Sequence, residues 1–478
     1  MTTLFADARP ASGAAERRGS GVAFEAVDGD LALDYARVAI EDGRLVAERD
    51  PFGTRPLFIT ADGRMAASSI GQLLPHVSRD LDDLAIARFL LGGTYVFPRD
   101  TVYRDVKRVA PSPFVPRAPS PPRRTVSRFV ELFDQAVAKR IPDDKVAVLM
   151  SGGLDSTSVA VSARRAGKRV LAYTLAWREH DDEAQFAAAV ARDAGLEHRV
   201  ILRDDYPLFA GWDTLQRDEP YDDAFAAPFL RAFAEASRET NVMLSGHGGD
   251  AVLYATRAHF RELLRGGRVL QFVRDFAGYS LRTGALPPLG FRSAFRNPEV
   301  PRVPPWIRAD LREEFAYEPA GEHPARPDAH RQTFAPVWPL LFEVFHPAQT
   351  GYDVNLAAPF FDRHLVEFLF SLPAMPWFGN KYLLRRAMRD RLPRVVARRP
   401  KAPMPARNIH AEIARAAPQL LELLDSAPEV DRYVDKAVLS RELHQTQADG
   451  SGAFTLLLPF CLAYWFRNRR DGCNQKTT

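Results

Sequence analysis

A short apolar run that ends in two glycines is the strongest constraint on how this chain folds. Residues 146–150 read Val-Ala-Val-Leu-Met, the pattern of a buried strand. Ser151, Gly152 and Gly153 follow directly, and residues 154–167 then carry apolar side chains at helical spacing. Adjacent glycines allow a tight turn whose N–H groups converge at the positive end of the following helix. The segment is therefore predicted to be a strand, loop and helix that bind a phosphate group.

The side chains of the loop strengthen this prediction. Ser151 and Ser156 provide hydroxyl donors, and Asp155 provides a carboxylate that can hold Mg²⁺ against phosphates. The Gly-Lys-[Ser/Thr] ending of a Walker A loop is missing. The order Ser-Gly-Gly-Leu-Asp-Ser instead resembles the PP-loop of ATP pyrophosphatases, which cleave ATP between its α- and β-phosphates. The alternative, an ordinary glycine turn between a strand and a helix, does not explain the flanking serines.

Composition places the chain among ordinary globular proteins. Its 478 residues suffice for two domains, and 46% hydrophobic with 26% charged residues is typical of a soluble protein. The net charge of +4 indicates no broad nucleic-acid-binding face. Cys461 and Cys473 support neither a disulfide framework nor a cysteine zinc site. No signal peptide is evident, and the apolar run 453–466 contains Pro459 and is too short for a bilayer, so we expect a core helix and a cytoplasmic protein.

A proline-dense segment, residues 109–122, divides the chain. It suits neither a helix nor a central strand, so we expect a small β-rich domain at 1–108, a linker at 109–125 and a larger domain at 126–470. In the first domain we expect a helix at 81–91. Strand-like runs there alternate with Asp-Gly turn signals at 42–43 and 62–63 and lie at residues 31–33, 44–47 and 56–60.

Strands that alternate with helices predict a parallel, doubly wound α/β sheet in the second domain. Ligands bind such sheets beyond the carboxyl ends of the strands, so the loops after Met150, Leu175 and Leu244 should meet at one site. After about residue 253 the chain is expected to be mostly helical, with a proline- and charge-rich interruption around 318–330. The expected strands are 146–150, 169–175, 199–202 and 242–244, and the expected helices are 126–139, 154–167, 184–194 and 229–237.

The loop after the last of these strands reads Ser-Gly-His-Gly-Gly-Asp over residues 245–250. With the PP-loop, it makes the second domain similar to the synthetase domain of asparagine synthetases, which carry Ser-Gly-Glu-Gly-x-Asp here. Asp-Pro-Phe-Gly-Thr-Arg-Pro at 50–56 resembles the glutaminase signature of that family, which implies a degenerate glutaminase-like domain of the Ntn type before the PP-loop ATP pyrophosphatase domain. The resemblance continues through the segments 358–362, 365–373, 380–385 and 398–401.

Two departures from the family change the expected reaction. The glutaminase uses a cysteine after the initiator Met, whereas this chain has Thr2. A threonine can also act as an N-terminal nucleophile, but the domain is shortened, and we expect no glutamine hydrolysis. His247 replaces the family's Glu, and Asn355 and Ala357 replace the Glu and Arg that often precede the Pro-Phe-x-Asp motif. Lasso-peptide cyclases typically carry the 245–250 sequence as it stands here, whereas β-lactam synthetases carry Tyr in a similar position.

The resemblance implies roles for individual residues. Asp155 and Asp250 would hold Mg²⁺, and Lys401 would stabilise the oxyanion formed by amine attack. Lys381 is a weaker candidate for phosphate contact. His247, with an ordinary pKa of about 6.5, would be either a general base or a structural hydrogen-bonding residue. Most of the arginines between 381 and 401 are expected on a solvated helix face. The residues that would contact ATP are Leu149, Ser151, Gly152, Gly153, Leu154, Asp155, Ser156, Leu175, Ser245, Gly246 and Asp250.

A lasso-peptide cyclase would adenylate an internal Asp or Glu of a linear, leader-free core peptide and close a macrolactam with the N-terminal amine of that peptide. A leader peptidase and a leader-binding protein would be transient partners, and neither nucleic acid nor a membrane is expected. Three alternatives remain: a β-lactam synthetase-like ligase, an ammonia-dependent asparagine synthetase and an inactive adaptor. Four aromatic residues after position 253 line a peptide cleft or belong to the core: Tyr254, Phe260, Phe272 and Trp306.

Overall fold

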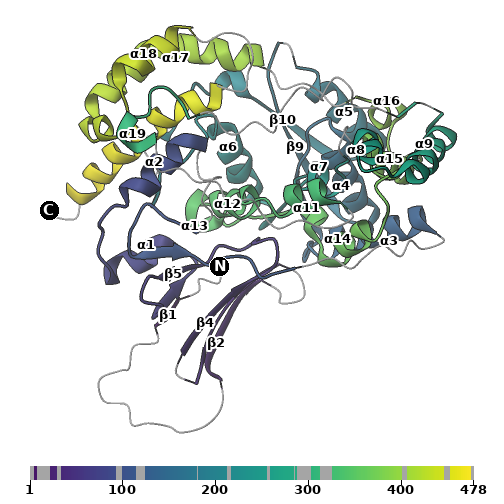
Figure 1. Cartoon of the computed structure of the whole chain (residues 1–478), viewed down its shortest axis with the longest axis horizontal. Helices are drawn as coiled ribbons and strands as arrows, with labels where there is room; N and C mark the ends of the chain where they lie inside the picture. Colours follow the sequence, from purple (N-terminus) through teal and green to yellow (C-terminus); the bar gives the residue numbers. More distant parts are fainter. Residues whose placement is uncertain are drawn as a thin grey trace.

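The computed structural model divides into an upper α/β body and a lower lobe of antiparallel strands (Figure 1). The N-terminal part of the chain, drawn in purple, forms the lobe. The C-terminal helices, drawn in yellow, lie on the body. The structure describes residues 5–7, 22–29, 34–42, 44–92, 99–114, 124–179, 181–212, 217–255, 259–284, 286–287, 303–312, 326–400, 406–445 and 453–474.

A five-stranded, fully parallel sheet forms the centre of the body, with the order β10-β9-β8-β11-β12. The four expected strands are all present, which confirms the doubly wound prediction. The chain runs outward from β8 through β9 to β10 and then returns to β11 on the other side of β8. The carboxyl ends of β8 and β11 are therefore adjacent at a topological switch point. The strands are β8 (Lys145–Leu149), β9 (Arg169–Ala176), β10 (Glu197–Leu202), β11 (Val242–Ser245) and β12 (Asn355–Ala357).

The expected helices of this body are also present. Val146, Ala147 and Val148 of β8 are fully buried, which explains why the strand is apolar at successive positions. The helix expected at 229–237 begins two residues earlier, with Pro228 in its first turn, where the missing N–H costs nothing. These helices are α3 (Thr125–Ala138), α4 (Leu154–Arg165), α5 (Glu183–Ala194), α6 (Ala227–Ala236) and the short α7 (Gly249–Val252).

Two antiparallel sheets, β2-β3-β4 and β1-β6-β5-β7, form the N-terminal lobe. Glu41 pairs with Arg44, and Asp42 between them has φ 48°, as expected for a hairpin turn at this point; residue 43 lies outside the described residues. Residues 31–33 lie outside the described residues. The elements are β1 (Phe5–Asp7), β2 (Val22–Gly29), β3 (Tyr35–Glu41), β4 (Arg44–Arg49), β5 (Phe58–Thr60), β6 (Met65–Ala67), β7 (Val106–Arg108), α1 (Ile70–Leu73) and α2 (Asp83–Gly92).

The lobe and the body share apolar cores. Phe52 belongs to the cluster around the parallel sheet, and Phe89 of α2 belongs to the same cluster as Phe460 of α19 (Ala453–Asn474). The apolar run at 453–466 therefore forms a core helix, as expected. Within the described ranges, no helix is both long enough and apolar enough to cross a bilayer.

The chain after residue 253 is mostly helical, as expected, but the interruption predicted around 318–330 is wrong from Pro327 onward. Pro327 occupies the first turn of α11, a position that accepts proline. Residues 313–325 lie outside the described part. The helices are α8 (His259–Arg265), α9 (Val269–Thr283), α10 (Ala309–Arg312), α11 (Pro327–Thr333), α12 (Val337–Val344), α13 (Pro347–Thr350), α14 (Arg363–Phe370), α15 (Tyr382–Ala387), α16 (Arg394–Ala397), α17 (Ala406–Ser426) and α18 (Lys436–Gln445).

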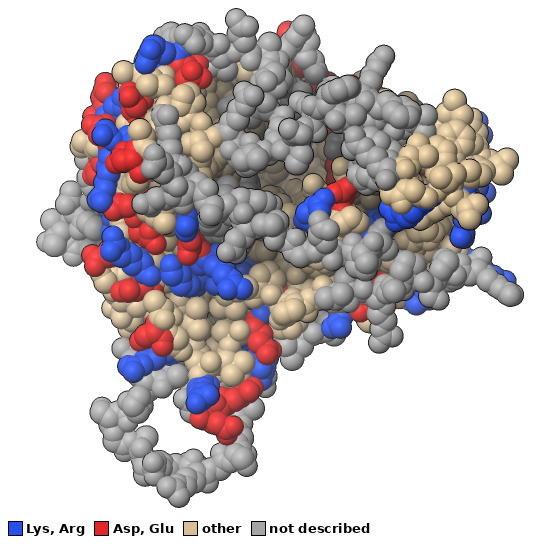
Figure 2. Space-filling view, viewed as in Figure 1, with Lys and Arg blue, Asp and Glu red and all other residues tan. Residues whose placement is uncertain are grey.

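Charges are distributed rather than gathered on the visible face. Over the described residues in Figure 2, Lys and Arg alternate with Asp and Glu, and tan uncharged areas separate them. This mixture agrees with the small net charge of +4.

Candidate functional site

The loop between β8 and α4 is held in place by its own serines. The hydroxyl of Ser156 donates to the carbonyl of Ser151 at 2.8 Å, and the two hydroxyl oxygens lie 3.1 Å apart. Gly153 precedes the first residue of α4 and has extended backbone angles. The hydroxyl groups and the first N–H groups of α4 thus gather at one end of the helix. This arrangement matches the predicted phosphate-binding loop.

The loop after β11 lies directly against this loop. A Cβ atom on Gly246 would lie 2.6 Å from the backbone nitrogen of Ser156, and one on Gly249 would lie 2.6 Å from Cγ of Asp155. No side chain fits either gap, which explains why both positions are glycine. A Cβ atom on Gly152 would likewise lie 2.6 Å from the carbonyl oxygen of Glu183, which follows β9. The expectation that the loops after Met150, Leu175 and Leu244 meet at one site is confirmed.

Two carboxylates and one ammonium group converge where these loops meet. Lys381 forms ion pairs with Asp155 and with Asp250, and the distance from its Nζ to Oδ1 of Asp250 is 2.5 Å. Asn380 and Lys381 both have positive φ angles, 49° and 54°, which are uncommon for residues with a side chain. Arg385 donates from Nε to the carbonyl of Asn380 at 2.9 Å and so stabilises this turn. The backbone at Asn380 and Lys381 is thus locally strained, and this conformation directs the side chain of Lys381 at the two aspartates.

The same convergence fits a magnesium ion. The carboxylates of Asp155 and Asp250 both contact one ammonium group, so their oxygens already face a common cation position. Magnesium usually takes one or two protein carboxylates and completes its shell with phosphates and water. Among the described residues, no group of three or more His, Cys, Asp or Glu forms a closed metal site.

His247 is a weaker base than its sequence position suggested. Its Nδ1 lies 2.9 Å from the hydroxyl oxygen of Ser245, and burial lowers the pKa of His247 to about 4. The imidazole is therefore neutral at pH 7 and accepts a proton less readily than an ordinary histidine. The expectation of a near-neutral pKa is wrong, and the contact with Ser245 favours the structural hydrogen-bonding alternative.

The segment that leads to position 401 is anchored rather than solvated. Arg385 donates to the carbonyls of Ala397 and Arg399, at 2.6 and 2.9 Å. Arg399 is only 8% exposed and forms an ion pair with Asp182. The prediction that most of the arginines here lie on a solvated face does not hold for Arg399, because it packs against Asp182 and Phe186. Lys401 lies outside the described residues.

Of the other expected contacts, Leu149 and Leu175 lie near the carboxyl ends of β8 and β9, and both are almost completely buried. Leu154 opens α4 and is also buried. The structure places these three side chains around the site, although their roles toward adenine remain predictions. Phe260 and Trp306 are core residues, whereas Tyr254 is 38% exposed. Phe272 is partly buried against Phe260.

The Asp-Pro-Phe-Gly-Thr-Arg-Pro and Ala-Pro-Phe-Phe-Asp segments support the site from behind. The ring of Phe361 lies 2.7 Å from where a Cβ atom of Gly248 would be, and Gly248 has φ 85°. Phe52 packs on Phe361, with ring centroids 5.2 Å apart. Arg55 donates to Oδ1 of Asn355 on β12 at 2.5 Å. The N-terminal lobe thus contacts the nucleotide loop through one intervening ring.

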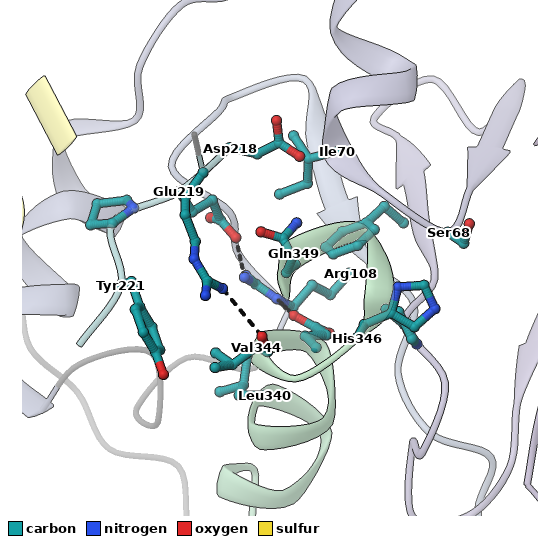
Figure 3. Close-up of a pocket in the computed structure, with 15 residues that line it drawn as sticks. Ser68, Ile70, Arg108, Asp218, Glu219, Tyr221, Leu340, Val344, His346 and Gln349 are labelled. Atoms are coloured by element: carbon teal, nitrogen blue, oxygen red, sulfur yellow. Dashed lines mark hydrogen bonds and ion pairs between the residues drawn. The ribbon is translucent and has the colours of Figure 1, made fainter. Parts of the chain in front are cut away.

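A separate cavity lies between the lobe and the body (Figure 3). Arg108 forms ion pairs there with Glu219 and Glu343, and Arg49 adds a contact of 3.3 Å to Glu343. The space there that water-sized molecules can enter is about 40 Å³, which is too small for a nucleotide. None of the expected ATP-binding residues lines it, so it is not the nucleotide site.

Comparison with known proteins agrees with this geometry. The family model described as asparagine synthase matches residues 128–467, which span the parallel sheet and most of the helices after it. A Mycobacterium bovis protein, provisionally described as a glutamine-hydrolyzing asparagine synthetase, is 26% identical over 76% of this chain. A Mycobacterium tuberculosis protein with the same description matches equally. The chain spans 65% of the length of each of these relatives.

A shorter similarity concerns proteins of another kind. A 7-cyano-7-deazaguanine synthase of Sphingopyxis alaskensis is 40% identical over 67 residues, 14% of this chain and 30% of that protein. The related protein of Novosphingobium aromaticivorans is 44% identical over 15% of this chain. It relates these proteins to this chain over a segment only.

Proposed function

Because this chain belongs to the asparagine synthase family, we propose that it is an ATP-dependent amide-bond ligase that forms AMP. The observation that carries this proposal is the convergence of Asp155, Asp250 and Lys381 beside the glycine loop at the carboxyl ends of β8 and β11. A phosphate-binding loop next to a pair of carboxylates suits a reaction that activates a carboxylic acid with ATP.

In the first step, an oxygen of the substrate carboxylate attacks the α-phosphorus of ATP. The bond from the α-phosphorus to the bridging oxygen breaks, and pyrophosphate leaves with both bonding electrons. The loop residues Ser151 and Ser156 would hold the phosphate chain, and Asp155 and Asp250 would hold a magnesium ion, which would offset the phosphate charge when bound. Lys381 gives up its contacts with the two aspartates and donates to a phosphate oxygen instead.

In the second step, the nitrogen of an amine attacks the acyl carbon of the adenylate. The bond from that carbon to the oxygen of AMP breaks, and the ammonium group formed on nitrogen loses a proton. Lys401 stabilises the oxyanion of the tetrahedral intermediate, by its match to the family lysine. Ser245 holds the imidazole of His247, and burial lowers the pKa of His247, which makes this residue a weak acceptor for the amine proton.

We propose that the acid and the amine belong to one peptide, so that the product is a macrolactam of the lasso type. The support is the Ser-Gly-His-Gly-Gly-Asp sequence at 245–250, in which His247 stands where asparagine synthetases have Glu. Asn355, another position that differs from those enzymes, bonds to Arg55. A leader peptidase and a leader-binding protein are the proposed transient partners. Thr2 in place of cysteine supports a lobe that does not hydrolyse glutamine.

The test is a parallel assay for AMP and for product mass. Each reaction contains the protein and MgATP with one of three acceptors: the linear core peptide encoded nearest the gene, a β-amino acid, or aspartate with ammonia. Loss of one water from the peptide together with AMP would support the cyclase. AMP in a small-molecule reaction alone would favour a β-lactam synthetase-like ligase or an ammonia-dependent asparagine synthetase.

A matched variant separates an enzyme from an adaptor. Asp155→Asn keeps the size of the side chain and removes one charge from the proposed cation site. An enzyme should lose AMP formation by at least a hundredfold, because the phosphate charge is no longer balanced. Asp144→Asn, an exposed aspartate before β8, is the control and should leave AMP formation unchanged. No AMP from the unmodified protein, with the peptidase pair added, would refute the ligase proposal.

A further inference from the structure

Arg399 is held rigidly below the glycine loop by three contacts. Its Nη2 forms an ion pair with Asp182, just before α5, and the guanidinium lies 4.2 Å from the ring centroid of Phe186. Its carbonyl accepts a hydrogen bond from Arg385 at 2.9 Å. With the residue only 8% exposed, little rotamer freedom remains to be lost when a ligand binds.

The other terminal nitrogen of this guanidinium, Nη1, is buried. Among the residues that the structure describes, Nη1 of Arg399 has no hydrogen-bond partner, and it lies 3.0 Å from where a Cβ atom of Gly152 would be. Burial of a donor on a charged group without an acceptor is costly, so such a group usually has a partner in the functional state. The open donor thus lies beside the loop that binds phosphate.

We propose that Arg399 is a phosphate-binding residue and that its Nη1 donates to the pyrophosphate end of ATP. This proposal depends on the proposed nucleotide site. A guanidinium that is already oriented by Asp182 and Phe186 presents its remaining N–H groups to a phosphate oxygen in a fixed geometry. The same contact stays with pyrophosphate after the α-phosphate has been transferred to the acid.

The contacts of the neighbouring cations support this assignment. Lys381 already contacts Asp155 and Asp250, so these carboxylates engage two of the three N–H donors of its ammonium group. Arg385 uses Nε, Nη1 and Nη2 on the carbonyls of three residues. Arg399 keeps a donor that none of the described acceptors uses. It therefore meets the phosphate chain with no prior bond to break.

The gap at Gly152 supports the same geometry. The space that a Cβ atom would fill is occupied by the carbonyl of Glu183, by Cβ of Phe186 and by Nη1 of Arg399. The glycine thus lets the loop backbone approach the guanidinium closely. The N–H groups of the loop and the guanidinium then act on one anion from adjacent positions.

The experiment is calorimetric titration of the full-length protein with MgATP, magnesium pyrophosphate and AMP, without an acid or an amine. Arg399→Gln removes the charge and the N–H fork, and Arg398→Gln changes the exposed neighbouring arginine as a matched control. We expect Arg399→Gln to weaken MgATP and pyrophosphate binding at least tenfold while AMP binding changes less than twofold. Arg398→Gln should leave all three affinities within twofold. Arg399→Lys keeps the positive charge but lacks the N–H fork, so its affinities for MgATP and pyrophosphate should lie between those of Arg399→Gln and the unmodified protein.

A purely structural role of Arg399 would lower all three affinities together, and that result would overturn the proposal. Unchanged MgATP affinity in Arg399→Gln would overturn it as well. If Arg399→Gln lowers the melting temperature, the test uses Arg399→Lys instead. A lower ratio of MgATP affinity to AMP affinity in Arg399→Lys than in the unmodified protein would support phosphate binding by Arg399, and an unchanged ratio would overturn it. Titrations need no turnover, so a missing amide product would refute the proposed ligase while the affinity ratio still tests Arg399.

Discussion

Replacement of Gly246 by alanine tests whether the two nucleotide loops must touch. The added Cβ atom would lie 2.6 Å from the backbone nitrogen of Ser156 and 2.9 Å from its Cα atom. Favourable contacts between non-bonded heavy atoms lie at about 3.5–4.0 Å. Because both neighbours are backbone atoms, no rotamer change relieves the overlap. The loop 245–250 must therefore move by roughly 1 Å away from the PP-loop and carry Asp250 with it.

The expected magnitude follows from this displacement. Overpacking of a tight site costs about 1–3 kcal/mol in the free energy of unfolding. A shift of about 1 Å in a group that positions the substrate costs on the order of a hundredfold in rate. Gly246→Ala should therefore remain folded, bind MgATP more weakly and form AMP about a hundredfold more slowly.

The assay pairs urea unfolding with AMP formation, and the control makes the same chemical change elsewhere. Gly278 lies inside α9, where the nearest atom to an added Cβ is the flexible end of Arg282, at 3.3 Å. Gly278→Ala should leave activity unchanged and raise the free energy of unfolding by about 0.5–1 kcal/mol, because alanine is the better helix former. Gly246→Ala with the stability and rate of the unmodified protein would refute the reasoning about loop contact.

Three further predictions concern the surroundings of the site. Burial lowers the pKa of His247 to about 4, so protonation of this residue favours the unfolded state. The free energy of unfolding should therefore decrease as the pH falls from about 6.5 toward 4. His247→Gln should flatten this part of the pH profile in urea unfolding. Glu343→Gln removes the carboxylate that Arg49 and Arg108 share, which leaves Arg49 without this ion pair and Arg108 with Glu219, and should cost about 3–5 kcal/mol in chemical denaturation. Phe52→Ala removes the ring that packs on Phe361, so it should lower the free energy of unfolding by about 3–5 kcal/mol and raise KM for MgATP. An unchanged KM would show that the lobe does not influence the loop after β11.

The sequence alone determined the parts of this protein that depend on local pattern. The apolar run of β8, the glycines at 152 and 153 and the helical spacing after them predict the strand, loop and helix that the structure contains. The order of strands and helices also predicts the parallel sheet, and the topology of such sheets brings the loops after β8 and β11 together. These features are predictable because neighbouring residues define the periodicity, the turn and the direction of each element.

Only the tertiary structure decided the contacts between distant residues. Lys381 meets Asp155 across 226 positions of the chain, and no local pattern indicates that a left-handed turn directs this lysine at two aspartates. Arg399 lies in a basic segment that resembles a solvated face, yet packing against Asp182 and Phe186 buries it. The three residues of β12 are too short for a strand signal, and pairing with β11 makes them one. Burial and long-range pairing depend on how whole elements pack, so the same charged side chain is solvent-exposed in one arrangement and a buried donor in another.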